Sequence, residues 1–198
     1  MLNKRIIIYL AKFSGAFCIC YFGTLAVIGL SAPGGYYSGF VARYLNFIPA
    51  FRNSLLHASE FFLSLFGYKA YQQTDILLTL EGGSSVQLVY ACLGYGVTSF
   101  WLAFVFANTG SWKKKLAWML GGAAVLYIIN VIRISLTLLG NNKKWHFPFG
   151  WDNHTWFNIV AYGGIFLMIY FYDRSGKEKP PPPPEGGTDR SEERSTKI

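Results

Sequence analysis

Residues 116–139 read LAWMLGGAAVLYIINVIRISLTLL, and this stretch decides what kind of fold the chain adopts. It contains a single charge, Arg133. A helix needs about 20 predominantly apolar residues to cross the hydrocarbon core of a bilayer. The stretch therefore predicts a transmembrane helix. It also predicts that the guanidinium of Arg133 faces protein or water and has a partner, because a charge at membrane depth is costly.

Three other apolar runs accompany this stretch: Ile6–Leu30, Gly94–Ala107 and Phe157–Tyr172. The first is long enough to cross a membrane alone, and the other two qualify when a few flanking residues join them. The chain is 52% hydrophobic and only 14% charged, whereas soluble domains carry about 25% charged residues. We predict an all-α polytopic membrane protein with about four transmembrane helices, embedded in the lipid bilayer over residues 1–172.

The net charge of +8 is interpreted as a signal of membrane orientation rather than of nucleic-acid binding. Basic residues gather on the cytoplasmic side of membrane proteins. Three basic groups fall on one side if there are four spans, and the segments on the other side hold fewer basic residues. The groups are Lys4, Arg5 and Lys12; Lys113, Lys114 and Lys115; and Arg174, Lys177 and Lys179. We therefore expect a multi-pass protein of the cytoplasmic (inner) membrane.

Residues 31–91 form a long segment on the opposite, outer side. Its first half mixes aromatic residues and arginines at helical spacing, which is typical of amphipathic helices in the membrane interface. Pro49 is expected to end or kink the first of these helices. Two β-prone runs, TDILLTL and SSVQLVY, flank Glu81, Gly82 and Gly83, and this pattern predicts a short β-hairpin.

The sequence after Tyr172 changes character and becomes polar, charged and rich in proline. Such a composition cannot bury enough apolar surface to fold. Residues 173–198 are therefore predicted to form a disordered cytoplasmic tail.

Four polar residues are expected near the outer ends of the predicted spans. Cys92 begins the second span, Asn130 and Arg133 share one face of the third, and His154 directly precedes the fourth. Arg133 lies six residues before Leu139, which is about 9 Å below the end of its helix. We predict that the thiol, the guanidinium and the imidazole meet at one depth on the outer side.

This combination of groups suits acyl transfer through a thioester. A thiolate is the nucleophilic form of cysteine, and a cation or a helix N-terminus favours it. His154 can act as base and then as acid, Arg133 can stabilise an oxyanion or thiolate, and Asp152 can orient His154. The other outer histidines, His146 and His57, remain alternatives to His154. Cys18 and Cys20 are expected to pack as small apolar residues, and no metal or cofactor is predicted.

Three motifs resemble those of the exosortase/archaeosortase family, in the same order. They are ACLGYG around Cys92, NVIRI from Asn130 to Ile134, and HTWFN from His154. The similarity covers residues 86–172, and the chain looks like a compact member of the family. It departs from the family at Leu93, where a serine is common.

The resemblance implies a membrane cysteine transpeptidase or protease. Its substrates would be exported proteins with a C-terminal sorting signal, which consists of a short motif, an apolar helix and a basic cluster. Cleavage would occur outside the cytoplasmic membrane, and the acyl group would pass to an acceptor nucleophile that the sequence does not identify. By resemblance, Cys92 is the nucleophile, Arg133 stabilises charge and His154 is the third catalytic residue.

Two other functions remain open. One is a non-catalytic membrane assembly or binding module, in which Arg133 and Asn130 form interhelical contacts. The other is a transporter subunit that uses Arg133 to bind an anion, although the spans contain few other charges.

Overall fold

The computed structural model describes residues 4–32, 36–143 and 153–176, and in the last helix it describes side chains from Ile159 onwards. The fold is mostly helical, as predicted, and it contains one small sheet. The elements are α1 (Lys4–Ser31), a π-helical turn η1 (Val41–Leu45), α2 (Ile48–Ser64), β1 (Ala70–Thr74), β2 (Leu77–Leu80), β3 (Ser85–Gln87), a 3-10 turn η2 (Tyr90–Leu93), α3 (Tyr95–Ala107), α4 (Trp112–Lys143) and α5 (Asn153–Gly176).

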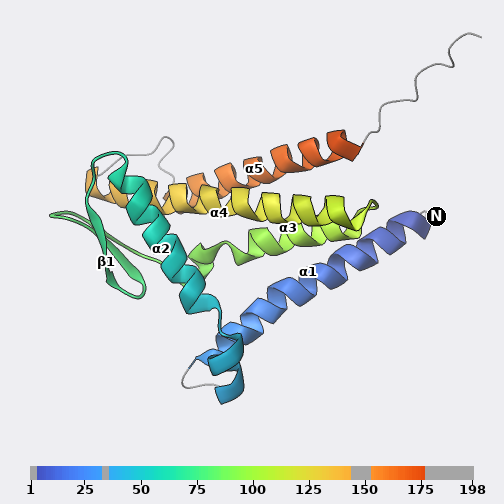
Figure 1. Cartoon of the computed structure of the whole chain (residues 1–198), viewed down its shortest axis with the longest axis horizontal. Helices are drawn as coiled ribbons and strands as arrows, with labels where there is room; N and C mark the ends of the chain where they lie inside the picture. Colours follow the sequence, from blue (N-terminus) through green and yellow to red (C-terminus); the bar gives the residue numbers. More distant parts are fainter. Residues whose placement is uncertain (1–3, 33–35, 144–152, 177–198) are drawn as a thin grey trace, which may run out of the picture.

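Helices α1, α3, α4 and α5 run lengthwise with alternating direction, and α2 and the sheet gather at one end of them (Figure 1). In sequence order, α1 packs on α3, α3 on α4, and α4 on α5. The start of α4 and the end of α5 meet at the other end, where Lys114 Nζ donates to the carbonyl oxygen of Ser175 at 2.5 Å. The basic residues at the starts of α1 and α4 and at the end of α5 therefore share one end of the molecule.

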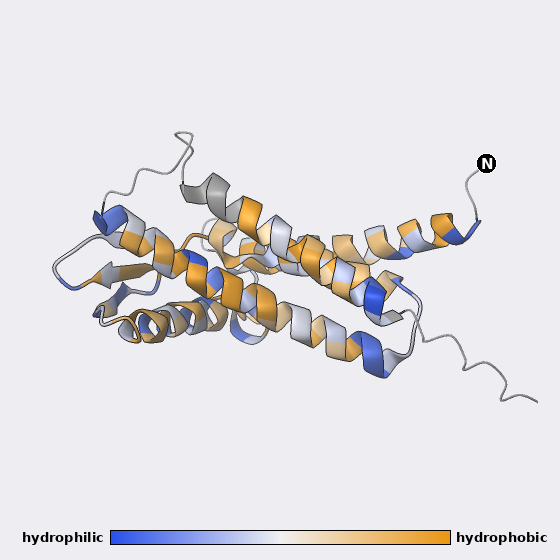
Figure 2. Ribbon diagram, turned by 90° about the horizontal axis from the view of Figure 1, so that it is seen from above, coloured by the Kyte–Doolittle hydropathy of each residue, from blue (hydrophilic) through white to orange (hydrophobic). Residues whose placement is uncertain are grey.

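Two helices in the described part, α1 and α4, are long and apolar enough to cross a membrane. No residue of α1 is buried, and Figure 2 shows apolar residues along its length. Exposed apolar surface of this extent is typical of a helix that faces lipid. α3 has 13 residues and is about 20 Å long, which is shorter than the hydrocarbon core of about 30 Å. The second and fourth predicted spans are thus confirmed as the helices α3 and α5, and their crossing of the membrane stays a prediction.

The outer segment folds into a cap made of α2 and a three-stranded antiparallel sheet in the order β1-β2-β3. The predicted hairpin is confirmed by the pairing of β2 with β3, and Gly82 takes a positive φ of 69° in its turn. Strand β1 was not predicted. Pro49 lies in the first turn of α2, where its missing N–H is harmless, so it begins this helix instead of ending the previous one.

Two apolar cores hold these parts together. One lies under the cap, where fully buried leucines of α2 and the sheet meet Val131, Ile134 and Leu138 of α4. The other lies between α3, α4 and α5 around the fully buried Trp101, whose Nε1 donates to the carbonyl oxygen of Trp118 at 3.0 Å. The first core fixes the outer half of α4 against the cap, and this is the half that carries Asn130 and Arg133.

Candidate active site

The sequence suggested that Cys92 lies at the N-terminus of α3. In the structure it lies in the short turn η2 instead. Its backbone N–H donates to the carbonyl oxygen of Val89 at 2.9 Å. Gly94 then takes a left-handed conformation with φ 74°, and α3 begins only at Tyr95. The left-handed residue turns the chain between η2 and α3, and non-glycine residues avoid this conformation. The thiol therefore lacks the helix N-terminus that was expected beside it, and any stabilisation of a thiolate must come from other groups.

Helix α4 supplies two such groups to the turn. Asn130 and Arg133 are three residues apart and share a helix face. Asn130 Nδ2 donates to the carbonyl oxygen of Cys92 at 3.0 Å, and Arg133 Nη2 lies 3.7 Å from Cys92 Sγ. Asn130 is only 8% exposed, so little of it is available to bulk solvent. The structure thus brings together Cys92, Asn130 and Arg133, which the sequence placed at one depth.

The guanidinium of Arg133 has no carboxylate partner among the residues that the structure describes. The ion pairs of His57 with Glu60 and of Lys69 with Glu81 both belong to the cap. The side-chain contact of Arg133 is with the sulfur of Cys92. Within the described part of the chain, the guanidinium is therefore placed to interact with an anion that develops next to the sulfur.

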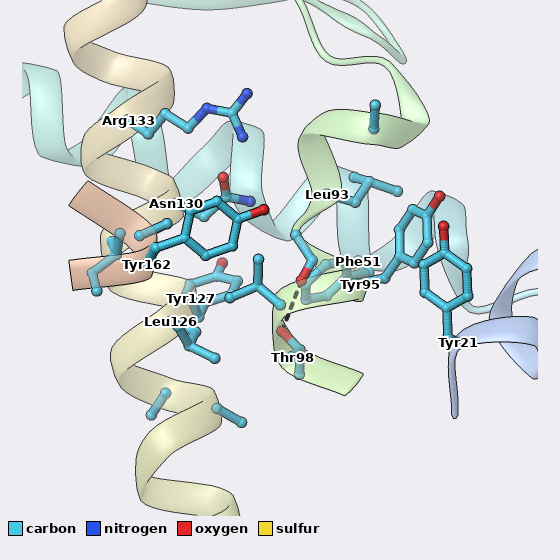
Figure 3. Close-up of a pocket in the computed structure, with 18 residues that line it drawn as sticks. Tyr21, Phe51, Leu93, Tyr95, Thr98, Leu126, Tyr127, Asn130, Arg133 and Tyr162 are labelled. Carbon is cyan, nitrogen blue, oxygen red and sulfur yellow. Dashed lines mark hydrogen bonds between the residues drawn. The ribbon is translucent and has the colours of Figure 1, made fainter. Parts of the chain in front are cut away.

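A cavity of about 550 Å³ lies next to this pair, and Arg133 lines it whereas Cys92 does not. Arg133 and Asn130 lie at one end of it, and the rings of Tyr127 and Tyr162 lie just beyond them (Figure 3). The neighbours of Cys92 in η2, Ala91 and Leu93, also line it. The remaining lining residues are mostly apolar or small and come from α1, α2, α3, α4 and α5: Tyr21, Phe51, Gly94, Tyr95, Gly96, Val97, Thr98, Ala123, Ala124, Leu126, Ile129 and Ala161.

The predicted histidines are placed only in part. His154 is the second residue of α5, and its side chain lies outside the described residues, as do His146 and Asp152 altogether. The alternative His57 lies on the exposed surface of α2, where its Nδ1 is 3.0 Å from Glu60 Oε2. Contact between His154 and the Cys92–Arg133 pair therefore stays a prediction.

The tyrosines of the cavity were missed from the sequence. Tyr127 and Tyr162 lie in apolar runs, where an aromatic residue is expected to pack or to mark the interface. One signal was available for Tyr127: it lies three residues before Asn130 and six before Arg133, so all three fall on one side of the helix. As for metals, the described part of the chain contains no group of three or more His, Cys, Asp or Glu residues that can hold an ion.

Comparison with known protein families gives one match. The family model for transmembrane exosortases matches residues 12–171, which extend from the first turns of α1 to the end of α5. Neither the curated proteins nor the solved structures gave a match. At the level of the family, exosortases are membrane cysteine transpeptidases related to protein sorting. Because the match covers most of the chain, including every element of the site, this protein belongs to the transmembrane exosortase family.

Proposed function

We propose that this protein is a cysteine transpeptidase or protease that cleaves the C-terminal sorting signals of exported proteins through a thioester. The observation that carries the proposal is the approach of Arg133 Nη2 to within 3.7 Å of Cys92 Sγ, with no carboxylate beside the guanidinium among the described residues. A cation held against a cysteine sulfur favours the nucleophilic thiolate. In a purely structural site the same arginine would be expected to have an acidic partner.

In the first step, the sulfur of Cys92 attacks the carbonyl carbon of the scissile peptide bond. A C–S bond forms, and the carbonyl oxygen becomes an oxyanion that Arg133 stabilises. The C–N bond then breaks, and the departing amine takes a proton from the catalytic acid. The products are a thioester on Cys92 and the released C-terminal signal.

In the second step, an acceptor nucleophile attacks the thioester carbonyl. A proton leaves the acceptor, the C–S bond breaks and the thiolate of Cys92 is restored. Water as acceptor gives hydrolysis, and an amine or hydroxyl gives transpeptidation or transesterification.

His154 is proposed as the acid and base, and helical geometry limits where it lies. A Cβ added to Gly164 would lie 3.0 Å from Ile129 Cδ1, so these residues mark where α5 crosses α4. His154 precedes Gly164 by ten residues, about 15 Å, and Arg133 follows Ile129 by four, about 6 Å. The two Cα atoms are thus offset by about 9 Å along the antiparallel helices. His154, in the first turn of α5, thus lies on the outer side of Arg133, which supports it as the residue that acts from that side.

We further propose that the site faces the outside of the cytoplasmic membrane, in a multi-pass protein. The support is the gathering of the basic ends of α1, α4 and α5 at the end of the molecule away from the cap. Positively charged ends stay in the cytoplasm, so the cap and η2 fall on the outer side. A substrate whose membrane helix ends in a basic cluster would lie in the same orientation, with its scissile bond at the level of Cys92.

A non-catalytic assembly module is the alternative, and one observation favours it. The bond from Asn130 to the Cys92 carbonyl ties α4 to η2, as expected of an interhelical contact. In that case Arg133 and Asn130 would matter for folding, whereas the thiol would be dispensable.

Replacement of Cys92 by alanine separates the two functions. We expect Cys92→Ala to insert and accumulate normally, because alanine keeps the backbone carbonyl that Asn130 binds. It should abolish C-terminal processing of exported proteins, measured by mass spectrometry of their C-termini in cells that produce the wild type or the variant. Normal processing in the variant would refute the proposed function.

A further inference from the structure

The small sheet of the cap has an open edge at β3. This strand is the last in the order β1-β2-β3 and pairs with β2 on one side. The Leu88 N–H donates to the Ile76 carbonyl at 2.7 Å, which shows which residues bond across this ladder. Because bonding alternates along an antiparallel pair, the backbone N–H and C=O groups of Ser85 and Gln87 point away from β2. These groups have no partner among the described residues, and both residues are exposed.

The opposite edge of the sheet, formed by β1, is protected in ways that the β3 edge is not. The register of β1 against β2 shifts between Gln72 and Thr74, and the charged residues Lys69 and Asp75 flank the strand. Irregularities and charges of this kind keep edge strands from pairing with other chains. Residues 84–91, with the sequence SSVQLVYA, contain no charge and no proline. The β3 edge is therefore the one suited to accept another strand.

This open edge leads directly to the catalytic cysteine. Val89 is still extended, with φ −77° and ψ 165°, so strand geometry continues beyond Gln87 to the start of η2. Three extended steps of about 3.3 Å and two 3-10 steps of about 2.0 Å separate Gln87 from Cys92 by about 14 Å at most. An extended peptide covers this distance with about four residues. A strand that pairs with β3 would thus bring its chain to the sulfur about four residues later.

We propose that the substrate segment before the scissile bond adds to the sheet as a fourth strand, parallel to β3. The proposal rests on the proposed function and adds the binding mode, which concerns the exported side of the scissile bond and not the apolar helix of the signal. Only an extended chain uses the free groups of Ser85 and Gln87, because a helix satisfies its backbone bonds internally. Main-chain bonds of this kind supply affinity when a peptide adds to a sheet edge.

The direction of the added strand follows from the topology. β3, η2 and α3 run in this order from the cap toward the basic end of the molecule (Figure 1). A substrate whose basic cluster lies in the cytoplasm runs the same way, so its strand is parallel to β3. The fourth residue before the scissile bond then lies beside Gln87, and the second lies beside Val89.

The first arm of the test removes one main-chain donor from the edge. It uses the full-length protein in membranes and a substrate identified by its processing in wild-type but not Cys92→Ala cells. Gln87→Pro deletes an N–H that points away from β2, and an edge strand tolerates proline there. Ala70→Pro is the matched control, because it deletes the equivalent N–H on the β1 edge. Gln87→Ala controls for the lost side chain.

We expect Gln87→Pro to process the substrate about three- to tenfold more slowly, which is the effect of one hydrogen bond. Ala70→Pro and Gln87→Ala should process it at the wild-type rate. Alkylation of Cys92 by N-ethylmaleimide should be unchanged in all three variants, which shows that the site is intact. Normal processing by Gln87→Pro would overturn the proposal.

The second arm needs no proline and measures direction and register. The Cys92→Ala protein, which cannot cleave, carries one new cysteine as Gln87→Cys, Val89→Cys or, on the far edge, Ala70→Cys. The substrate carries a cysteine at one position from the second to the sixth before the scissile bond. We expect disulfides of Gln87→Cys to peak two residues farther from the scissile bond than those of Val89→Cys. Ala70→Cys should form none above background.

The reverse order of these peaks, or no disulfide from Gln87→Cys and Val89→Cys, would overturn the proposal. A disulfide between two Gln87→Cys chains in place of one with the substrate would also overturn it, and would indicate that two copies of the protein pair at this edge. Both outcomes leave the role of Cys92 intact. Processing that persists in Cys92→Ala would instead refute the proposed function itself.

Discussion

The hydrogen bond from Asn130 to Cys92 gives the most quantitative test of the site geometry. It is 3.0 Å long, and only 8% of Asn130, the residue that donates it, is exposed. Asn130→Ala leaves the Cys92 carbonyl without this donor, at a cost of about 1–3 kcal/mol for a buried unsatisfied group. Interhelical hydrogen bonds in membranes give smaller values, with an average of about 0.6 kcal/mol and a maximum of about 1.7. We therefore expect a loss of about 1–2 kcal/mol.

For a chain of this length, about 1 kcal/mol corresponds to roughly 2–4 °C in the melting temperature. Asn130→Ala in detergent should therefore melt about 2–8 °C below the wild type, measured by tryptophan fluorescence. Ser135→Ala is the control: its buried hydroxyl donates only to the Val131 carbonyl within the same helix. Removal of that bond leaves no interhelical group unpaired, so its melting temperature should change less. Equal melting temperatures for the two variants would refute the view that Asn130 fixes η2 to α4.

Two other substitutions test the backbone around the site. Gly94→Ala should lower stability by about 1–2 kcal/mol because the φ of Gly94, 74°, is left-handed. Gly121→Ala, on the exposed face of α4, should raise stability by up to about 1 kcal/mol. Thermal melting of both variants checks the two signs, and an unchanged melting temperature for Gly94→Ala would contradict the described turn. Gly122→Ala should destabilise by about 1–3 kcal/mol, because a Cβ there meets the indole of Trp101, which is held by its bond to the Trp118 carbonyl. In the double variant Gly122→Ala, Trp101→Phe, the smaller ring removes the clash but also removes the hydrogen bond to the Trp118 carbonyl. We therefore expect this double variant to be no more stable than Gly122→Ala alone.

Much of the architecture was predictable because long apolar runs leave few alternatives. The stretches that became α1 and α4 have the length of a membrane-spanning helix, and Gly82-Gly83 between β-prone runs predicted the hairpin that β2 and β3 form. Strand β1, with the sequence AYQQT, was not predictable in the same way. This segment lacks the alternation of apolar and polar residues that is typical of a strand. In the structure it pairs with β2, and Gln72 donates a hydrogen bond to Asn53 in α2.

The proximity of Cys92, Asn130 and Arg133 was predictable from the sequence, but the backbone that carries the cysteine was not. Helical spacing correctly placed Asn130 and Arg133 on one face of α4, and the order of the segments placed Cys92 opposite them. The break between η2 and α3 was missed because Gly94 lies in a continuous apolar run, where a glycine is compatible with a helix. The contact of η2 with α4 that accompanies this turn is also not visible in the sequence. The cavity was missed for the same reason, since its five helices converge only in the folded chain.

The most direct test of the central claim is to capture the acyl group that Cys92 is proposed to carry. Hydroxylamine attacks thioesters and leaves a hydroxamate on the acyl group. Membranes that contain the wild-type protein and its substrate should therefore yield, in the presence of hydroxylamine, a processed protein that ends in a hydroxamate, identified by mass spectrometry. Membranes with Cys92→Ala should yield none. A processed C-terminus that hydroxylamine does not alter, or a hydroxamate that still forms without Cys92, would contradict the thioester and with it the role of the cysteine.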